Sequence, residues 1–569
     1  METREESVFS FMSGSGNFKE FNFKTDIERV KYLYKTKGHL QVNIGTPQVT
    51  ISEDKRWLFI TFKVNEGPAF YVNNINFEGD LLFTQSELFE GMKLKKDELY
   101  SEELLRFDIQ RLTEMYQDKG YAFANVYRTL KVVPGEDRAD VFFGFEKGSL
   151  AKIGKIIVKG NSKTRDKVIR RELTIKEGML FSGSAMRVSK ENVNRLGFFE
   201  PTSIIFNTVA RENEPDVLDV EISIKEKETG QFVFGAGYST ASKAFIQASI
   251  SKTNFLGLGQ ELNFTFNYAS KSQEYSFGYF EPYLFDSKWS TGSRVYYITD
   301  ESSDSFSDRR KGVEFRFGHP IFDYTRFYTI YRLDETKIFR ALDPTVDVNL
   351  ENGIASTVES YVELDIRDNR YDPLNGTYAR LSGEYTGLGG DKKWSKAYMD
   401  ARFYKNFYGD FVFRTRLYMA QLFINENRDI PRSNKFYLGG SRDLRGYGVE
   451  DIGPKRDVTI PRTVNGVTEN VIIPFNMRGM GKVFANIELE HPLIKEGGLK
   501  WVLFYDVGNI YRRRIGERHP DDSTVRMDWG FGFRWLSPIG QLRFEFGYPI
   551  NKRPGDDGRQ FHFDIGQLF

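Results

Sequence analysis

The chain has 569 residues, of which 15% are aromatic, and its 80 Lys and Arg residues against 79 Asp and Glu residues give a net charge of +1. This balance argues against a nucleic-acid-binding protein, which usually carries a large basic excess. No run of about 18 apolar residues occurs, which excludes membrane-spanning helices but not a transmembrane β-barrel, whose strands alternate apolar and polar residues. The absence of cysteine excludes disulfides and thiolate sites.

The first residues, Met1 to Glu6, lack the basic start and the apolar core of a secretory signal. Either the protein stays inside the cell or the printed chain begins after a removed segment. We expect the second, because of the pattern that follows.

A pattern of strand, helix, helix, strand and strand occurs twice from about residue 70, at a period of roughly 80 residues. In the first copy the predicted elements cover 70–77, 84–90, 101–119, 121–133 and 139–146. In the second copy they cover 151–158, 163–172, 182–196, 202–211 and 216–225. The repeat predicts two α+β domains, at 70–148 and 149–228.

Residues 1–69 resemble a third, incomplete copy, with a helix over 26–37 and strands over 39–51 and 57–64. Its first strand is absent, so we expect a truncated domain. Three unrelated α+β modules are the alternative.

From about residue 230 helical periodicity gives way to short strands whose residues alternate between two faces. Near the end of the chain, for example, Phe544 and Phe546 alternate with Arg543 and Glu545. Sixteen such segments begin near residues 231, 244, 260, 273, 289, 310, 325, 357, 376, 394, 410, 481, 500, 526, 540 and 560. An even number of strands closes a bacterial barrel, so 229–569 is predicted to be a 16-stranded antiparallel transmembrane β-barrel.

A soluble propeller or sandwich is the alternative to the barrel, because its strands alternate too. The apolar face here is rich in Phe, Tyr, Leu and Trp, and the other face carries Arg, Glu, Asp and Asn. That contrast suits a wide, wet lumen better than a packed core.

The longest predicted connection, residues 422–480, separates the eleventh strand from the twelfth. It contains a glycine-dense stretch at 439–447 and a polar segment at 458–470 that we expect to form an exposed tip. Connections of this length are usually functional or disordered.

Several motifs, together with their order along the chain, resemble those of the BamA family of outer-membrane assembly factors. Members of that family carry POTRA repeats before a barrel. The loop motif is Leu444-Arg445-Gly446-Tyr447. Further matching segments are Phe504 to Asn509, Phe280 to Phe285 and the Arg-Asp-Asn-Arg stretch within 365–376, with a β-signal at 561–569.

The resemblance implies that the loop folds inward and that Arg445 bonds Asp506, with Glu488 or, on the same face, Glu490 as a second carboxylate. Alternation supports this placement, because it puts Asp506 on the face opposite Tyr505 and Val507. A guanidinium binds carboxylates with two directional bonds, which a lysine cannot do. The predicted lock between loop and barrel consists of Leu444, Arg445, Gly446, Tyr447, Asp506, Glu488 and Glu490. From spacing alone, a surface loop with a solvated arginine is an equal alternative.

The resemblance also implies a weakly paired seam between the first and last barrel strands. The predicted seam residues are Phe232, Phe234, Gly235, Gly237, Phe563, Gly566 and Phe569. An exposed strand edge templates the addition of another strand, so a client strand would pair along 231–239. The middle strands of the repeats, within 39–51, 121–133 and 202–211, are further candidate edges for extended polypeptide or a lipoprotein. A rigid spacer is the alternative role of the repeats.

The function that the resemblance implies is the folding and insertion of β-barrel proteins into the bacterial outer membrane, without ATP, with the repeats in the periplasm. Implied partners are unfolded barrel clients, periplasmic chaperones, accessory Bam lipoproteins, outer-membrane lipid and lipopolysaccharide. Rival functions are a POTRA-barrel transporter that secretes polypeptide, as in two-partner secretion, a TamA-like factor, or a passive porin. We expect no cofactor and no enzymatic activity, and the five scattered histidines predict no metal site.

Overall fold

The computed structural model describes residues 18, 20–54, 57–239, 243–301, 303, 305–369, 372–425, 429–464, 467–495, 497–516, 524–537, 540–553 and 556–565. The chain divides into two compact units, Met1–Glu228 and Thr229–Phe569. No helix in the described part of the chain is long and apolar enough to cross a membrane.

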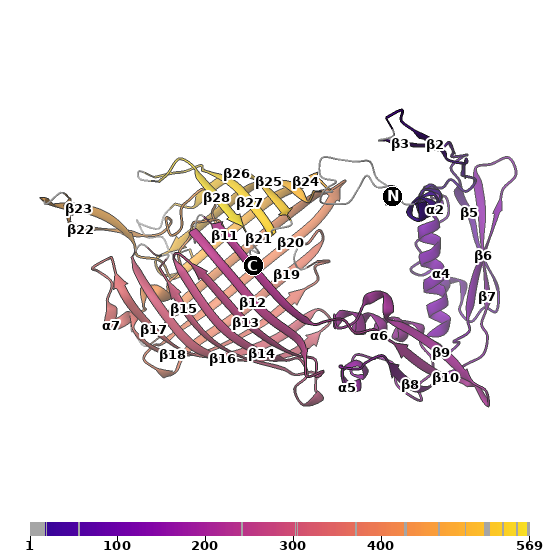
Figure 1. Ribbon diagram of the computed structural model, residues 1–569, viewed down its shortest axis with the longest axis horizontal. Coiled ribbons are helices and arrows are strands. Elements are labelled where there is room, and N and C mark those ends of the chain that lie inside the picture. The colour runs from indigo at the N-terminus through magenta and orange to yellow at the C-terminus, as the bar shows by residue number, and fades with distance from the viewer. Residues whose placement is uncertain are drawn as a thin grey trace. The chain divides into compact units, whose positions relative to one another are not determined.

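The domain that starts at residue 70 is a three-stranded sheet covered by two helices (Figure 1). Its elements are β5 (Tyr71–Gly79), α3 (Gln85–Phe89), α4 (Glu102–Gln117), β6 (Asn125–Val132) and β7 (Arg138–Glu146). The strand order is β5-β7-β6, so β5 and β6 are both edges. Ser101 caps α4 by accepting a hydrogen bond from the Leu104 N–H, and Leu105 and Leu112 pack against the apolar face of the sheet.

The next domain repeats this topology. Its elements are β8 (Lys152–Lys159), α5 (Asp166–Arg170), α6 (Gly183–Arg195), a 3₁₀ turn (Pro201–Ser203), β9 (Ile205–Arg211) and β10 (Glu214–Ser223). The strand order is β8-β10-β9, and Ser182 caps α6 as Ser101 caps α4. In both domains the last strand lies in the middle of the sheet, parallel to the first strand and antiparallel to the second.

The residues before this pair of domains form a helix and two small sheets. The elements are α2 (Glu20–Thr36), β1 (Asn43–Ile44), β2 (Gln48–Ile51), β3 (Leu58–Thr61) and β4 (Val64–Asn65). The single strand predicted over 39–51 is therefore wrong. It is interrupted at Gly45 to Pro47, where proline has no N–H to donate to a ladder.

The second unit is a closed barrel of sixteen strands, which confirms the predicted fold class (Figure 1). The first eight are β11 (Gly230–Ser239), β12 (Lys243–Phe255), β13 (Gln260–Ala269), β14 (Ser272–Glu281), β15 (Ser290–Asp300), β16 (Phe306–Phe322), β17 (Thr325–Ala341) and β18 (Gly353–Asp365). The others are β19 (Gly376–Gly390), β20 (Trp394–Tyr408), β21 (Phe411–Ile424), β24 (Gly481–Ile494), β25 (Leu499–Tyr511), β26 (Arg526–Ser537), β27 (Gly540–Pro549) and β28 (Gln560–Ile565). Short helical turns lie at Leu284–Asp286, Val348–Glu351 and Arg432–Asn434.

The connection between β21 and β24 differs from its prediction in one respect. Its polar segment, predicted as an exposed tip, forms the end of a two-stranded ribbon that the sequence analysis did not predict, β22 (Lys455–Val464) and β23 (Val467–Asn476). Val458 and Ile460 alternate with polar residues and lie near Val471 and Ile473 across the ribbon. This alternation favours strands, although the segment is polar on average.

Candidate functional site

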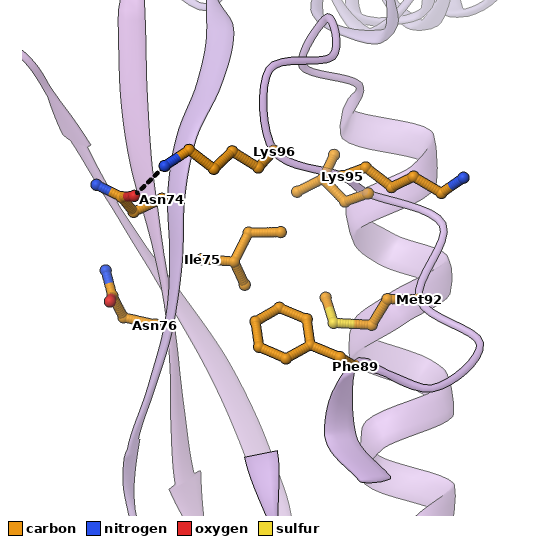
Figure 2. A pocket seen from close by; sticks show the side chains of 8 residues that line it. Asn74, Ile75, Asn76, Phe89, Met92, Lys95 and Lys96 are labelled. Carbon is orange, nitrogen blue, oxygen red and sulfur yellow. Dashed lines mark hydrogen bonds between the residues drawn. The ribbon is translucent and has the colours of Figure 1, made fainter. Parts of the chain in front are cut away.

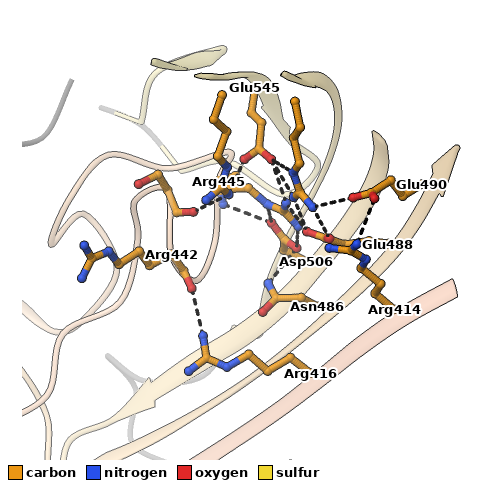
Figure 3. A network of polar contacts seen from close by, with 12 residues as sticks. Arg414, Arg416, Arg442, Arg445, Asn486, Glu488, Glu490, Asp506 and Glu545 are labelled. Carbon is orange, nitrogen blue, oxygen red and sulfur yellow. Dashed lines mark hydrogen bonds and ion pairs between the residues drawn. The ribbon is translucent and has the colours of Figure 1, made fainter. Parts of the chain in front are cut away.

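The loop between β21 and β24 makes a tight turn before its arginine motif. Gly439 has a φ of 111°, which favours glycine, and a Cβ there would meet the Gly448 carbonyl oxygen. The Asp443 carboxylate accepts hydrogen bonds from the N–H groups of Gly439 at 2.9 Å and Leu444 at 2.8 Å. The turn directs the Arg445 side chain towards the barrel wall (Figure 3).

Arg445 is only 2% exposed and bonds carboxylates on two strands. Its Nε and Nη2 donate to the two oxygens of Asp506 on β25, at 2.8 and 2.6 Å, and its Nη1 donates to Glu488 on β24 at 2.5 Å. The guanidinium carbon also lies 3.6 Å from the centre of the Phe504 ring. The structure thus brings together three of the predicted lock residues, Arg445, Asp506 and Glu488 (Figure 3).

The remaining predicted carboxylate, Glu490, lies one step away from Arg445. Its carboxylate accepts from Arg414 and Lys500, each at 2.9 Å, and from Arg534 at 3.1 Å. Arg534 on β26 also donates to Glu488, so Glu490 joins the network through a shared arginine.

The other residues of the motif pack closely against the wall. A Cβ on Gly446 would lie 2.3 Å from the Cβ of Asp528, so only glycine fits between the loop and β26. The Tyr447 hydroxyl donates to the Met527 carbonyl and lies 3.2 Å from it. Leu444 is fully buried in an apolar cluster with residues of β24 and β25.

The barrel also bonds the loop backbone from several strands. Carbonyl oxygens of the loop accept hydrogen bonds from the wall as follows: Ser441 from Arg543 on β27, Arg442 from Arg416 on β21, Asp443 from Asn486 on β24, and Arg445 through Nε2 of His562 on β28. The last contact is 2.8 Å long and joins the loop to the final described strand of the barrel. The backbone of residues 441–445 is therefore fixed to the wall, in addition to the Arg445 side chain.

Among the described residues, the first barrel strand has far fewer ladder partners on the last strand than on the second strand. β11 pairs with β12 along its whole length, from Gly230 opposite Lys252 to Ser239 opposite Lys243. In the described residues, β11 meets β28 at one position, Ser239 opposite Asp564. The N–H and C=O groups on that side of β11 are thus largely without a described ladder partner.

The predicted seam residues lie on both sides of this joint. Phe232 and Phe234 on β11 are 68% and 64% exposed, as expected for lipid-facing side chains, and a Cβ on Gly235 would meet open space. Phe563 on β28 stacks on Phe544 of β27. The backbone of Gly237 pairs with Phe245, whereas Gly566 and Phe569 lie outside the described residues.

Sequence reasoning missed three parts of this site, namely Arg534, Glu545 and His562. Glu545 is fully buried, 3.6 Å from Arg445 Nη1, and Arg534 donates to it at 2.8 Å. Alternation places Glu545 on the polar face, but only the strand register shows that it reaches Arg445. His562 gives no signal in the sequence beyond its position on the same face. No cluster of three or more potential metal ligands occurs in the part of the chain that the structure describes.

Comparisons with known proteins identify the class of protein. Residues 254–569 match the Omp85 superfamily domain, and residues 70–148 and 151–227 match the POTRA repeat, described as a surface antigen variable number repeat. The chain therefore belongs to the Omp85 superfamily, whose fold here combines POTRA domains with a 16-stranded barrel.

Similar proteins include outer-membrane protein assembly factors. The factor BamA of Nitratidesulfovibrio vulgaris is 28% identical, covering 99% of this chain and 70% of its own length. The crystal structure of Haemophilus ducreyi BamA lacking POTRA domains 1–3 has a TM-score of 0.66 at 23% identity, covering 87% of this chain and 99% of that one. CdiB from Escherichia coli shares the fold at a TM-score of 0.51 and 14% identity, covering 96% of each chain. The protein is an outer-membrane protein with periplasmic POTRA domains.

Proposed function

We propose that this protein folds β-barrel clients and inserts them into the bacterial outer membrane without ATP. The observation that carries the proposal is the pairing of β11, complete towards β12 and limited, in the described residues, to Ser239 opposite Asp564 towards β28. An unpaired strand edge is a template for another strand. A client strand would add to β11, and later hairpins would add to the client in turn.

The driving force in this scheme comes from the client itself. Each added strand pairs backbone groups that would otherwise be unsatisfied in lipid. Each unsatisfied N–H or C=O group there costs on the order of several kcal/mol. The exposed Phe232 and Phe234 keep the template strand at the lipid surface. No nucleotide and no covalent step is needed, and the residues of the site act by position.

The loop lock has a separate role in the proposal. Arg445, Asp506 and Glu488 hold the loop against β24 and β25, and His562 extends the hold to β28. The strands next to the seam therefore keep one position while the seam opens. The lock makes the opening local, so the barrel keeps its shape when β11 changes partner.

The partners in this proposal are unfolded barrel proteins, the periplasmic chaperones that deliver them, accessory Bam lipoproteins, and the lipid and lipopolysaccharide around the seam. The edge strands β6 and β9 are candidate docking sites for such partners, because each lies at the end of its sheet.

The test is the folding rate of a denatured outer-membrane protein in lipid vesicles that contain the full chain. We expect faster folding than in empty vesicles and in vesicles with a porin of equal mass. Unchanged client folding together with passage of an unfolded polypeptide into the vesicles would instead support a secretion pore.

A further inference from the structure

The two complete POTRA domains differ at the free edge of their first strand. In both domains this strand has a bulge, after which Ile75 lies opposite Val141 and Ile156 lies opposite Val220. The bulged residue is held in the same way, because the N–H of Asn74 donates to Asp140 and that of Lys155 donates to Asp219. The backbone groups of Ile75 and Ile156 therefore point to the same side, away from the middle strand.

In the second domain this edge is closed by two side chains. Glu177 accepts a hydrogen bond from the Ile156 N–H at 3.0 Å, and Arg170 donates to the Ile156 carbonyl at 2.6 Å. The two side chains also lie 3.6 Å from each other. Both backbone groups that another strand would use are thus occupied.

In the first domain the same edge is open. Arg170 and Glu177 lie 14 and 21 residues after Ile156, and the same offsets from Ile75 lead to Phe89 and Lys96. Phenylalanine cannot bond a carbonyl and lysine cannot accept from an N–H. Within the described residues, no side chain or loop backbone group bonds the N–H or C=O of Ile75.

A cavity of about 470 Å³ lies beside this open edge (Figure 2). Its apolar lining comes from Ile75, Phe89, Met92 and Leu94, and Phe89 is 45% exposed. Lys95 and Lys96 lie at its rim, and Lys96 Nζ donates to the Asn74 side chain at 3.0 Å. Because this contact is exposed and joins the ammonium to a neutral amide, Lys96 can exchange it for the carboxylate of a ligand.

We propose that this groove binds an extended segment of an unfolded outer-membrane client, which adds as a strand to β5 at Ile75. The inference rests on the proposed function, since it names where the client is held before it reaches the barrel. Backbone bonds to Ile75 give affinity, one large apolar side chain of the client fills the cavity, and Lys95 and Lys96 attract an acidic residue beside it. A barrel strand offers this alternation of apolar and polar residues, as Phe561, Phe563 and Asp564 of this chain illustrate.

The difference between the edges of β5 and β8 also implies that only one of the two domains holds the client at this edge. The edge of β8 is already satisfied by its own Arg170 and Glu177. Exchanging Phe89 and Lys96 with Arg170 and Glu177 should therefore move the binding site from one domain to the other. Each domain then carries residues that already occur at the equivalent positions of the other domain, so both should still fold.

The experiment uses the full chain in lipid nanodiscs and a fluorescent peptide with the sequence of residues 557–569. A photo-crosslinking amino acid replaces Asn76 beside the groove, Ile157 at the equivalent place, or Thr129 on the β6 edge. We expect capture of the peptide from position 76, at least a ten-fold loss of that capture in Phe89→Arg/Lys96→Glu, and new capture from position 157 in Arg170→Phe/Glu177→Lys.

Capture from position 76 that is unchanged in Phe89→Arg/Lys96→Glu would overturn the inference, as would capture from position 129 alone. The Arg445→Ala variant should retain full capture at position 76, because the peptide binds before insertion. Capture at position 76 without client folding in vesicles would contradict the proposed function and leave the groove in place. Client folding without groove-dependent capture would contradict the groove alone.

Discussion

The two flanks of β11 differ in how many of their described residues pair with it. Towards β12 every residue from Gly230 to Ser239 has a partner, whereas towards β28 the described pairing is Ser239 with Asp564. The strands that lead up to the seam, β24 to β28, also bond the loop. Arg445 of the loop bonds Glu488 on β24, and Arg543 on β27 and His562 on β28 bond carbonyl groups of the loop. A buried ionic network is weak evidence of stability but can fix one arrangement. Among the described residues, β11 is therefore held towards β12 by a full ladder, whereas side-chain bonds to the loop hold the strands beside the seam.

Removing the arginine of the lock should have the largest effect. In Arg445→Ala, buried Asp506, Glu488 and Glu545 lose a cation, and breaking such a network by deleting one partner costs about 3–5 kcal/mol. We expect the rate of client folding in vesicles to fall at least ten-fold, and Arg445→Lys to recover only part of it because lysine cannot bond Asp506 with two N–H groups.

The matched control is Arg380→Ala. Arg380 also pairs with a carboxylate, Glu359 at 2.5 Å, and lies 3.8 Å from the ring of Tyr361, but none of its described contacts is with the loop. An equal loss of client folding in both variants would show that any lumen arginine matters and would remove the lock from the mechanism.

Crowding the loop against the wall should have the next largest effect. A Cβ in Gly446→Ala would overlap Asp528, and the shift needed to relieve it costs about 1–3 kcal/mol. We expect a several-fold loss of client folding. The double variant with Asp528→Gly removes the opposing Cβ and should recover activity, whereas no recovery would place the effect of Gly446 elsewhere.

The link between the loop and the last strand should have a smaller effect. His562→Ala removes one hydrogen bond to the Arg445 carbonyl, worth about 1 kcal/mol, which corresponds to roughly five-fold in rate. Glutamine retains a donor, so His562→Gln should fold clients at close to the original rate. Similar rates for the alanine and glutamine variants would mean that this bond does not couple the loop to the seam.

A change of pH should have the smallest effect. It should lower the stability of the first complete POTRA domain and should not involve the seam. Burial raises the pKa of Glu102, but hydrogen bonds from Arg128 and Tyr100 outweigh it, so the net pKa lies below the usual value. Because the folded pKa is depressed, the stabilisation is present above the unfolded value of about 4.3 and is lost as pH falls through the folded pKa.

Hydrogen exchange of α4 and β6 in the full chain measures this effect. Glu102→Gln should increase exchange at pH 7, and the difference from the unchanged chain should be smaller at pH 3, below the unfolded pKa. A difference that is equal at both pH values would assign the effect to shape and not to charge.

The sequence predicts the architecture well because the information is local. Alternation gives the sixteen strands, and their starts agree with the structure to within a few residues. The register is not local. Glu545 approaches Arg445, and Arg534 bonds Glu488 and Glu545, only because of the strand register, which no spacing in the sequence reveals. The open edge at Ile75 was missed for a related reason, since its meaning lies in Arg170 and Glu177 of the neighbouring repeat.

A reversible closure of the seam tests strand addition at β11 most directly. The chain has no cysteine, so Ser239→Cys with Asp564→Cys can form one disulfide across the paired position of β11 and β28. We predict that oxidation stops client folding in vesicles and that reduction restores it, while either single variant remains active in both states. Full activity of the oxidised double variant would contradict strand addition at this seam.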